Sequence, residues 1–477
     1  MISTASGLQQ QHVLTQRNHH HLGAPAAVKP GFLARTRGGG APGRGRAPNA
    51  AAAAAAVTSS PSSPPSVPGV PGNVPVVSAV EPLFRPLSLG PGLDLAHRLV
   101  LAPLTRCRAG PGDTPAPSAA LYYGERAAAP GTLLISEASP ISPQARGYPG
   151  TPGLWTAEQV EAWRPVVRAV KDAGSVFCAQ LWHVGRASCD LYQPGGGPPV
   201  SASAIAIPPP WTLYGPGGEG PFPYPTPRPL AADEIDGIVQ DFVTAAKNAV
   251  AAGFDMVEVH AANGYLLAQF LSDGSNARKG DAYSGASPAS RARFLLRVVQ
   301  AVADALGSAG RVGVRLSPFN EFLACVESRP LATYGHAVSE LLKIRAEGDA
   351  SGAALAYLHF VEPRIDATFE PRDTDLTLAP YTAMARAAGV AVITAGGWEP
   401  GPAAEAVASG DVDLVCVGRE WIGSPDLPKR WALGLRGNKG DRAMYYSGGE
   451  EGYTTYACLS PEEEGAAIEA AVAARRG

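Results

Sequence analysis

The chain has 477 residues, with 39 Lys and Arg against 42 Asp and Glu, so its formal net charge is −3. This balance does not indicate a nucleic-acid-binding surface, for which a basic excess is expected. No apolar stretch is long enough to span a bilayer and no apolar core of a secretory signal is present, so neither a membrane span nor secretion is expected.

The first eighty residues differ in composition from the rest. No Asp or Glu precedes Glu81, whereas basic residues do, at Arg17, Lys29, Arg35, Arg37, Arg44 and Arg46. An alanine run at 50–56 and a stretch rich in Ser, Pro and Val follow. Such composition buries too little apolar surface to offset chain entropy, so residues 1–80 are predicted to be disordered. The Arg-rich, acid-free pattern is typical of an organelle transit peptide and linker, with a chloroplast or other plastid expected before a mitochondrion. A plain low-complexity tail is the alternative.

After residue 80, short apolar runs alternate with longer helical ones. Strands are predicted at 99–104, 133–139, 175–181, 255–261, 311–317, 355–361, 390–397 and 413–419. Helices are predicted at 157–173, 232–252, 288–307, 333–347, 377–388 and 400–409. The strands are nearly continuous apolar runs, as expected of parallel strands that are covered on both faces.

Eight β/α units in one long domain, over residues 81–460, favour a (β/α)8 TIM barrel of the α/β class. An open, doubly wound sheet is the alternative. Two long excursions, 184–231 and 264–287, follow strands and are therefore expected on the carboxyl face of the barrel, where binding loops lie. Residues 461–477 are expected to form a C-terminal tail or helix.

Two matches to the pattern GxGxxG, at 38–43 and 215–220, do not predict a dinucleotide site. That fingerprint requires a strand before it and a helix after it, and neither match has this context. The histidines at 19–21 lie in the low-complexity segment, and no metal site is expected.

The ends of the seventh and eighth predicted strands indicate a phosphate site. ITAGGW (393–398) and CVGRE (416–420) each finish an apolar run with glycine. In barrels the loops after these two strands commonly bind phosphate through backbone N–H groups, which glycine allows to approach closely. Arg419 would add a cation. Simple strand-to-helix turns are the alternative.

Polar residues also stand inside or beside other apolar runs, near the carboxyl ends of the predicted strands. They are Thr105, Gln180, His260, Asn263 and Arg315. One such residue is commonly a satisfied polar group of the core. Five of them at equivalent strand ends indicate an active site.

Several segments, in chain order from Glu81 to Leu459, resemble the old yellow enzyme family of FMN-dependent ene-reductases, and most closely its plant 12-oxophytodienoate reductases. They are LAPLTRCRA (101–109), QLWHVGR (180–186), VEVHAANGYLLAQFLS (257–272), GVRLSP (313–318), HFVEPR (359–364), AGGW, and VGRE followed by SPDLPKR.

The resemblance implies that an FMN lies across the barrel mouth. The residues that it assigns to the cofactor are Pro103, Leu104, Thr105, Ala138, Gln180, Arg315, Gly396, Gly397, Gly418 and Arg419. The Thr105 hydroxyl would reach the flavin O4, and Ala138 would leave room beside the ring. The cation of Arg315 would stabilise the anionic reduced flavin. The glycines and Arg419 would hold the phosphate.

The resemblance also implies catalytic roles. His260 and Asn263 would donate hydrogen bonds to the carbonyl of the substrate, and Tyr265 would protonate its α-carbon. Arg364 and Tyr446 would border the substrate. Trp182 would lie near the flavin.

The implied reaction has two halves that share one flavin face. NADPH or NADH reduces FMN and leaves, and an α,β-unsaturated ketone or aldehyde then accepts hydride at its β-carbon. The expected partner is a small enone, and the expected state is a monomer or weak homodimer. Another FMN barrel, such as a dihydroorotate dehydrogenase or a 2-hydroxy-acid oxidase, is one alternative. A barrel that binds a ligand without catalysis is the other.

The chain also departs from the family pattern. The segment DAYSGASPASR (281–291) stands where a Tyr-Gly-Gly segment and an Asn-Arg pair are usual. Ser424 replaces a common Asn, Glu420 and Trp421 replace apolar residues, and the Pro/Gly-rich part at 211–228 is long. These changes are expected to affect substrate preference more than FMN binding.

Overall fold

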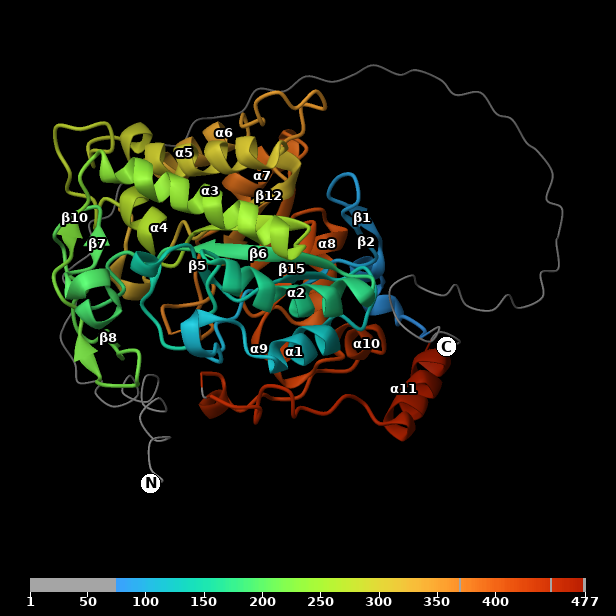
Figure 1. The fold of residues 1–477 in the computed structure, drawn as a ribbon. Helices are drawn as coiled ribbons and strands as arrows, with labels where there is room; N and C mark the ends of the chain where they lie inside the picture. Colours follow the sequence, from blue (N-terminus) through green and yellow to red (C-terminus); the bar gives the residue numbers. More distant parts are fainter. Residues whose placement is uncertain (1–73, 369, 447, 475–477) are drawn as a thin grey trace, which may run out of the picture.

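The computed structural model describes residues 74–368, 370–446 and 448–474 (Figure 1). The sequence predicts disorder and a transit peptide for residues 1–80. Residues 1–73 lie outside the described residues.

Parallel strands form a closed barrel. In chain order they are β3 (Leu99–Leu101), β4 (Leu133–Ile135), β6 (Val176–Trp182), β11 (Met256–Ala261), β12 (Val312–Leu316), β13 (Tyr357–Val361), β14 (Ala391–Ala395) and β15 (Leu414–Val417). Each strand pairs in parallel with the next in this order, and β15 pairs with β3. The ring therefore has no open edge. The predicted (β/α)8 barrel is confirmed, and the open sheet is excluded.

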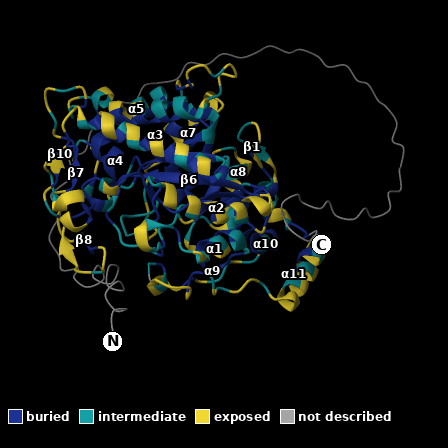
Figure 2. Ribbon diagram, viewed as in Figure 1, coloured by how far each residue is buried: buried dark blue, intermediate teal, exposed yellow. Residues whose placement is uncertain are grey.

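The apolar runs of the sequence follow from burial on both faces of this ring. Strands β6 and β11 are buried along their whole lengths, as Figure 2 shows for β6. One face of each strand packs inside the barrel and the other packs under the helices, so polar residues have few places on these strands. The polar side chains that do occur there are consequently informative about function.

The predicted strand at 133–139 is two short strands, β4 and β5 (Ser139–Pro140). Between them the Ser136 hydroxyl, rather than a backbone carbonyl, accepts the Gln180 N–H at 3.1 Å. The chain leaves the ladder of β6 at this point. Ala138, which the sequence assigned to the flavin site, lies in the resulting bend.

Helices cover the outside of the barrel. The predicted helices are present as α2 (Ala157–Asp172), α3 (Glu234–Ala252), α5 (Pro288–Leu306), α6 (Pro330–Leu341), α7 (Ala379–Ala387) and α8 (Pro400–Ala408). A reciprocal capping box between Thr156 and Gln159 starts α2. Helix α6 starts earlier than predicted, at Pro330, because a proline fits a first turn where no backbone donor is needed. Helices α3, α5 and α6 lie side by side in Figure 1.

Other helices were not among the predicted ones. They are α1 (Ser118–Arg126), α4 (Leu266–Leu271), α9 (Arg419–Gly423) and α10 (Leu427–Ala432). The C-terminal segment, expected to be a tail or a helix, forms α11 (Pro461–Ala474). The buried positions of α1 are Ala119, Tyr122, Tyr123 and Arg126, which have helical spacing. Because the first of these residues is small and the last is charged, the spacing does not show as a hydrophobic pattern.

The folded part of the chain begins earlier than Glu81. A 3-10 helix, η2 (Ser78–Phe84), packs against α8 and α10, and the Val77 N–H donates to the Ala432 carbonyl at 2.9 Å. The buried side chains of this segment are Val74, Val76, Val80, Leu83 and Phe84. The predicted boundary at residue 80 is therefore corrected, because residues 74–80 form part of the core.

A hairpin of β1 (Leu87–Ser88) and β2 (Asp94–Leu95) covers the amino end of the barrel. Leu93 and Leu95 pack in one cluster with the first residues of several barrel strands, among them Leu133, Val176 and Met256. The hairpin thus fills the end of the barrel that lies opposite the expected active site.

The Pro/Gly-rich excursion contains short strands. Strands β8 (Thr212–Leu213) and β9 (Phe222–Pro223) form an antiparallel hairpin, whereas β7 (Val200–Ser201) and β10 (Arg228–Pro229) pair in parallel. Figure 1 shows these strands together beside the barrel. The excursion is therefore an ordered addition to the barrel.

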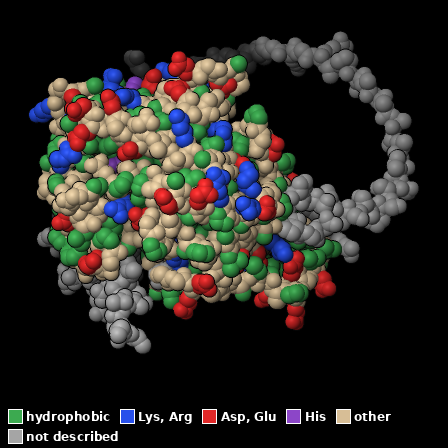
Figure 3. All heavy atoms as spheres, viewed as in Figure 1, with side chains coloured by type: hydrophobic (Ala, Val, Ile, Leu, Met, Phe, Trp, Pro, Cys, Tyr) green, Lys and Arg blue, Asp and Glu red, His purple; other side chains and the backbone are tan. Residues whose placement is uncertain are grey.

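Within the described ranges, no helix has the length and apolar character that a membrane crossing requires. On the face shown in Figure 3, acidic and basic side chains are interspersed, and no large patch of one sign is present there.

The packing of residues 74–84 yields a test of stability. A chain that begins at Pro86 should unfold at a much lower temperature than one that begins at Val74, because each of the lost apolar side chains contributes about 1.5–3 kcal/mol when buried. A chain that ends at Ser460 is the control, since α11 buries only Ala467 and Ala471 among its described residues. Equal midpoints for the chains that begin at Val74 and Pro86, measured by circular dichroism, would contradict the assignment of residues 74–84 to the core.

Candidate active site

The barrel register brings polar side chains together inside the ring. Glu258 of β11 stands opposite Gln180 of β6, and His260 stands opposite Arg315 of β12. Arg315 in turn stands opposite His359 of β13. Side chains two residues apart on a strand share a face, so Glu258 and His260 belong to the same side of β11. The strand pairing alone thus assembles residues that are up to 179 positions apart, the separation of Gln180 and His359.

Glu258 is the centre of a buried network. Its carboxylate accepts a hydrogen bond from Gln180 Nε2 at 2.6 Å and lies 2.8 Å from His359 Nδ1. Burial raises the pKa of Glu258, but His359, Arg315 and the Gln180 amide together lower it further than burial raises it. Burial lowers the pKa of His359, which is therefore a neutral donor to an ionised carboxylate.

His260 is also neutral. Burial, with smaller effects of Arg315 and His359, holds the pKa of its imidazole well below the usual range. Its Nδ1 accepts the Ala262 N–H at 3.3 Å, so the proton is on Nε2. His260 therefore offers one N–H donor, which is the form that a substrate oxygen requires.

Asn263 lies in the turn that follows β11. Its φ of +56° and the φ of +72° at Gly264 reverse the chain before α4. The Asn263 backbone N–H donates to Ser317 Oγ at 2.8 Å, which fixes this turn to the end of β12. The turn places the side chain of residue 263, half-buried, beside the end of the strand that carries His260.

An aromatic cluster surrounds these donors. The ring of Tyr265 lies 5.1 Å from that of His260 and 4.9 Å from that of Trp182, edge to face in both cases. The Tyr265 hydroxyl is 3.2 Å from the hydroxyl of Tyr148. Burial raises the pKa of Tyr265, so this phenol carries its proton at neutral pH. Tyr446 raises the pKa of Tyr265 further, so Tyr446 also lies near this aromatic cluster.

The expected phosphate loops lie at the ends of β14 and β15. Gly397 has a φ of +62°, and a Cβ at position 396 would lie 2.5 Å from the Glu362 Cβ. A Cβ at Gly418 would lie 3.1 Å from Leu104 Cδ2, so the end of β15 packs closely against the end of β3. The contact at residue 396 leaves space for glycine only, and a Cβ at residue 418 would require Leu104 to shift.

Two arginines flank these loops. The Arg364 guanidinium lies over the Trp398 ring at 4.0 Å, and two of its nitrogens are buried without a partner among the described residues. Arg419, the first residue of α9, is half-exposed and lies 3.5 Å from a Glu370 oxygen. The structure thus places Arg364 beside the loop that follows β14, and the assignment to the substrate that the family resemblance implies stays a prediction.

The other residues assigned to the flavin lie at the ends of β3 and β4. Pro103, Leu104 and Thr105 follow β3 and are half-buried. Ala138 packs in one cluster with Trp182 and Tyr265. The structure therefore brings the predicted residues to one end of the barrel. Several of them are predicted to contact FMN rather than other residues of the site.

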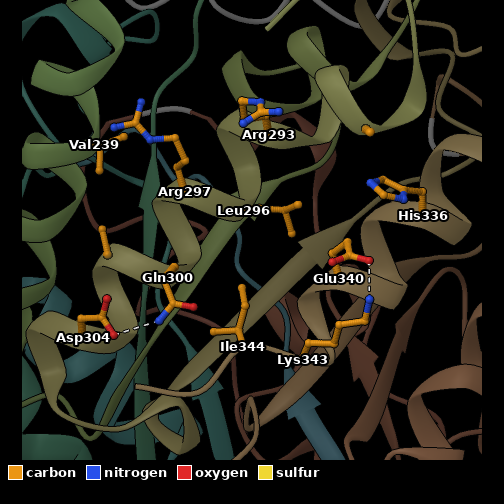
Figure 4. A pocket seen from close by; sticks show the side chains of 12 residues that line it. Val239, Arg293, Leu296, Arg297, Gln300, Asp304, His336, Glu340, Lys343 and Ile344 are labelled. Atoms are coloured by element: carbon orange, nitrogen blue, oxygen red, sulfur yellow. Dashed lines mark hydrogen bonds and ion pairs between the residues drawn. The ribbon is translucent and has the colours of Figure 1, made fainter. Parts of the chain in front are cut away.

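One pocket in the described part of the chain is lined by none of the predicted site residues. A surface pocket of about 660 Å³ lies between α3, α5 and α6, where Lys343 pairs with Glu340 and Gln300 pairs with Asp304 (Figure 4). A cavity of about 30 Å³ lies at the barrel mouth beside Asn263. The chemistry is assigned to the mouth, because the polar network lies there.

Known proteins resemble this chain in sequence and in fold. The model of the NADH:flavin oxidoreductase / NADH oxidase family matches residues 82–438. 12-Oxophytodienoate reductase 1 of Oryza sativa subsp. japonica is 42% identical over 388 residues, which cover 81% of this chain and 96% of the relative. The structure of morphinone reductase has a TM-score of 0.72 at 42% identity and covers 80% of this chain and 97% of that chain. An old yellow enzyme homologue from Zymomonas mobilis has a TM-score of 0.71 at 36% identity and covers 79% and 99%.

The chain therefore belongs to the NADH:flavin oxidoreductase / NADH oxidase family. The resemblance to the old yellow enzyme family is confirmed, and the protein is an NAD(P)H-dependent oxidoreductase of that type with FMN as its cofactor. This membership does not support the alternatives of another class of FMN barrel or of a barrel without catalysis.

The residues at the mouth fit FMN. Arg315 Nε is buried and has no hydrogen-bond partner among the described residues, so a cationic donor is free at the end of β12. Arg364 likewise has free donors beside Gly397, at the end where a phosphate is expected. Arg315, Gln180 and Thr105 would hold the ring system, and the glycine loops with the arginines would hold the phosphate.

Sequence reasoning missed Glu258, His359 and Tyr148. A signal existed for the first two, because a carboxylate and an imidazole inside apolar strand runs require buried partners. No local signal existed for Tyr148, because it lies in a loop whose position depends on the folded barrel.

The close contact at Gly396 gives a test of the phosphate loop. Gly396→Ala should lower the affinity for FMN by about tenfold or more, because forcing a Cβ against Glu362 costs about 1–3 kcal/mol. The dissociation constant of FMN from apo-protein, measured by flavin fluorescence, checks this. Gly401→Ala in α8 is the matched control, since a Cβ there meets no atom within 4 Å. Equal FMN affinity in both variants would argue against the loop as the phosphate site.

Proposed function

We propose that this protein reduces the C=C bond of α,β-unsaturated ketones or aldehydes at the expense of NAD(P)H. The observation that supports this most directly is the group formed by a neutral His260, Asn263 and a protonated Tyr265 at the mouth. It supplies hydrogen-bond donors for a carbonyl oxygen and an acid that can protonate the neighbouring α-carbon. An enone is the simplest substrate that needs both.

Bound FMN would supply the hydride chemistry, with NAD(P)H as the reductant and the β-carbon of the enone as the acceptor. His260 and Asn263 hold the carbonyl oxygen of the enone and stabilise the negative charge that develops there. Tyr265 gives its proton to the α-carbon. Arg315 supplies a fixed positive charge at the end of β12, and Glu258 holds the side chain of Gln180 through a hydrogen bond.

The relatives support the class of substrate and of reductant. Their names refer to a 12-oxo compound and to morphinone, both of which are ketones. One morphinone reductase structure is a complex with tetrahydroNAD. By analogy, this chain would bind a nicotinamide at the mouth of its barrel. An olefin that carries a ketone would bind there after the nicotinamide has left.

Removal of the Tyr265 hydroxyl separates the two half-reactions. Tyr265→Phe should spare reduction of FMN by NADPH and slow oxidation of the reduced enzyme by cyclohexenone about a hundredfold or more, since general acids typically contribute at least this factor. Anaerobic stopped-flow absorbance of the flavin measures both rates.

Tyr381→Phe is the control, because its buried hydroxyl has no partner among the described residues. Wild-type protein that bleaches with NADPH but does not regain colour with any of several cyclic enones would overturn the proposed reaction. Unchanged enone reduction in Tyr265→Phe would overturn only the role of that residue.

We also propose that the segment before Val74 directs the protein to a plastid. Its basic, acid-free composition supports this, and a mitochondrion is the alternative. A fluorescent protein fused after residue 73 should accumulate in chloroplasts of leaf cells. As a control, replacement of the six basic residues by Gln should leave the fusion in the cytosol. Cytosolic fluorescence of the unaltered fusion would contradict this proposal.

A further inference from the structure

Helix α4 contains a buried glutamine next to the turn that carries Asn263. The side chain of this residue, Gln269, is fully buried. Figure 1 shows α4 beside β7, the first strand of the Pro/Gly-rich excursion. An amide in such a place needs hydrogen-bond partners, because an unpaired polar group is costly to bury.

The Gln269 amide has four such partners. Its Nε2 donates to the Gly264 carbonyl at 2.8 Å and to the Val184 carbonyl at 2.9 Å. Its Oε1 accepts the backbone N–H of Arg186 at 3.1 Å and the hydroxyl of Ser201 at 2.9 Å. These bonds use both donors and both lone pairs of the amide. The side chain therefore ties the turn after β11 to the loop after β6 and to β7.

The surroundings of Gln269 are specific for an amide. A Cβ at Gly185 would overlap Gln269 Oε1, so the loop after β6 fits closely around this side chain. A carboxylate has the same shape but offers no donor for the two carbonyls, and an apolar side chain offers neither a donor nor an acceptor. Either replacement would leave buried backbone groups unpaired.

The turn that Gln269 contacts has a backbone that needs support. Asn263 has a φ of +56° and Gly264 a φ of +72°, so two successive residues are left-handed. A residue other than glycine keeps this conformation where its surroundings fix it. Here one hydrogen bond acts on each side, because the Asn263 N–H donates to Ser317 Oγ and the Gly264 carbonyl accepts from Gln269. The turn is thus held from β12 and from α4.

We propose that Gln269 is a positioning residue for Asn263 and Tyr265, which it holds through the carbonyl of Gly264 between them. The inference rests on the proposed function, because it assumes that these two side chains act on the enone. The hydrogen bond fixes the peptide group that joins residues 264 and 265. Such support matters, because a shift of about 1 Å in groups that act on a substrate can slow a reaction about a hundredfold.

The test removes the amide and measures both catalysis and cofactor binding. Gln269→Met keeps the length of the side chain and removes all four hydrogen bonds. It should slow oxidation of the reduced enzyme by cyclohexenone about tenfold to a hundredfold. The dissociation constant of FMN, measured by flavin fluorescence, should stay within about twofold of wild type, because none of the four partners is assigned to the cofactor. A wild-type rate with cyclohexenone, or a large loss of FMN affinity, would overturn the inference.

A second comparison separates positioning from a general loss of structure. In a background of Asn263→Gly and Tyr265→Phe, Gln269→Met should slow the reaction with cyclohexenone no further, because it acts only through those two side chains. Glycine is chosen at residue 263 because it adopts a left-handed backbone without strain. A full additional loss in this background would contradict the positioning role.

Gln159→Met is the matched control. Gln159 of α2 is also fully buried, and its amide accepts the Trp155 and Thr156 N–H groups and donates to the Gly112 carbonyl. None of these partners is assigned to the cofactor or the substrate. This variant should lower the unfolding temperature, as Gln269→Met does, and yet react with cyclohexenone like wild type. Equal slowing in both variants would show a general effect of losing a buried amide and would refute the inference.

If Gln269→Met does not fold, Ser201→Ala decides the question. It removes one of the four hydrogen bonds and should slow enone reduction about threefold. Slow enone reduction in Asn263→Gly with wild-type rates in both Gln269→Met and Ser201→Ala would refute this inference alone. Wild-type rates in Asn263→Gly and in Tyr265→Phe would instead refute the proposed roles of those two residues.

Discussion

The carboxylate of Glu258 is fully buried between the amide of Gln180 and the imidazole of His359, inside a ring of strands that also carries the cation of Arg315. A buried charge is costly unless it is paired and hydrogen-bonded, so these partners must hold fixed positions. Closure of the ring supplies that order, because β6, β11, β12 and β13 pair in register. The donors that face the mouth are thus held by a network behind them.

The same network sets the charge states of the groups around it. Burial, with smaller effects of Arg315 and His359, keeps His260 neutral, and a neutral imidazole with its proton on Nε2 donates without carrying a positive charge into the site. A protonated imidazole there would add a second cation beside Arg315. The arrangement therefore separates two tasks, with one fixed cation at the end of β12 and uncharged donors on β11 and the turn after it.

Much of this architecture could be predicted from the sequence, because apolar strand runs and the residues that end them are local features. The glycines after β14 and β15, and His260 at the end of an apolar run, were recognisable for this reason. Features that depend on distant contacts were not. Residues 74–80 have the composition of a linker and yet pack on α8 and α10, and Arg364 lies over Trp398 only because two loops meet. Tyr224 is buried directly after β9, although the Pro and Gly content of its segment does not predict a core position.

The hairpin of β1 and β2 packs its leucines against the first residues of the barrel strands, so the amino end of the barrel is filled. The reactants of the proposed cycle consequently share the opposite entrance. NAD(P)H and the enone would therefore exclude each other while either is bound. A large excess of NAD(P)H would occupy the reduced enzyme that the enone needs, and a large excess of enone would occupy the oxidised enzyme that NAD(P)H needs. For the proposed cycle, closure of the far end of the barrel thus predicts substrate inhibition.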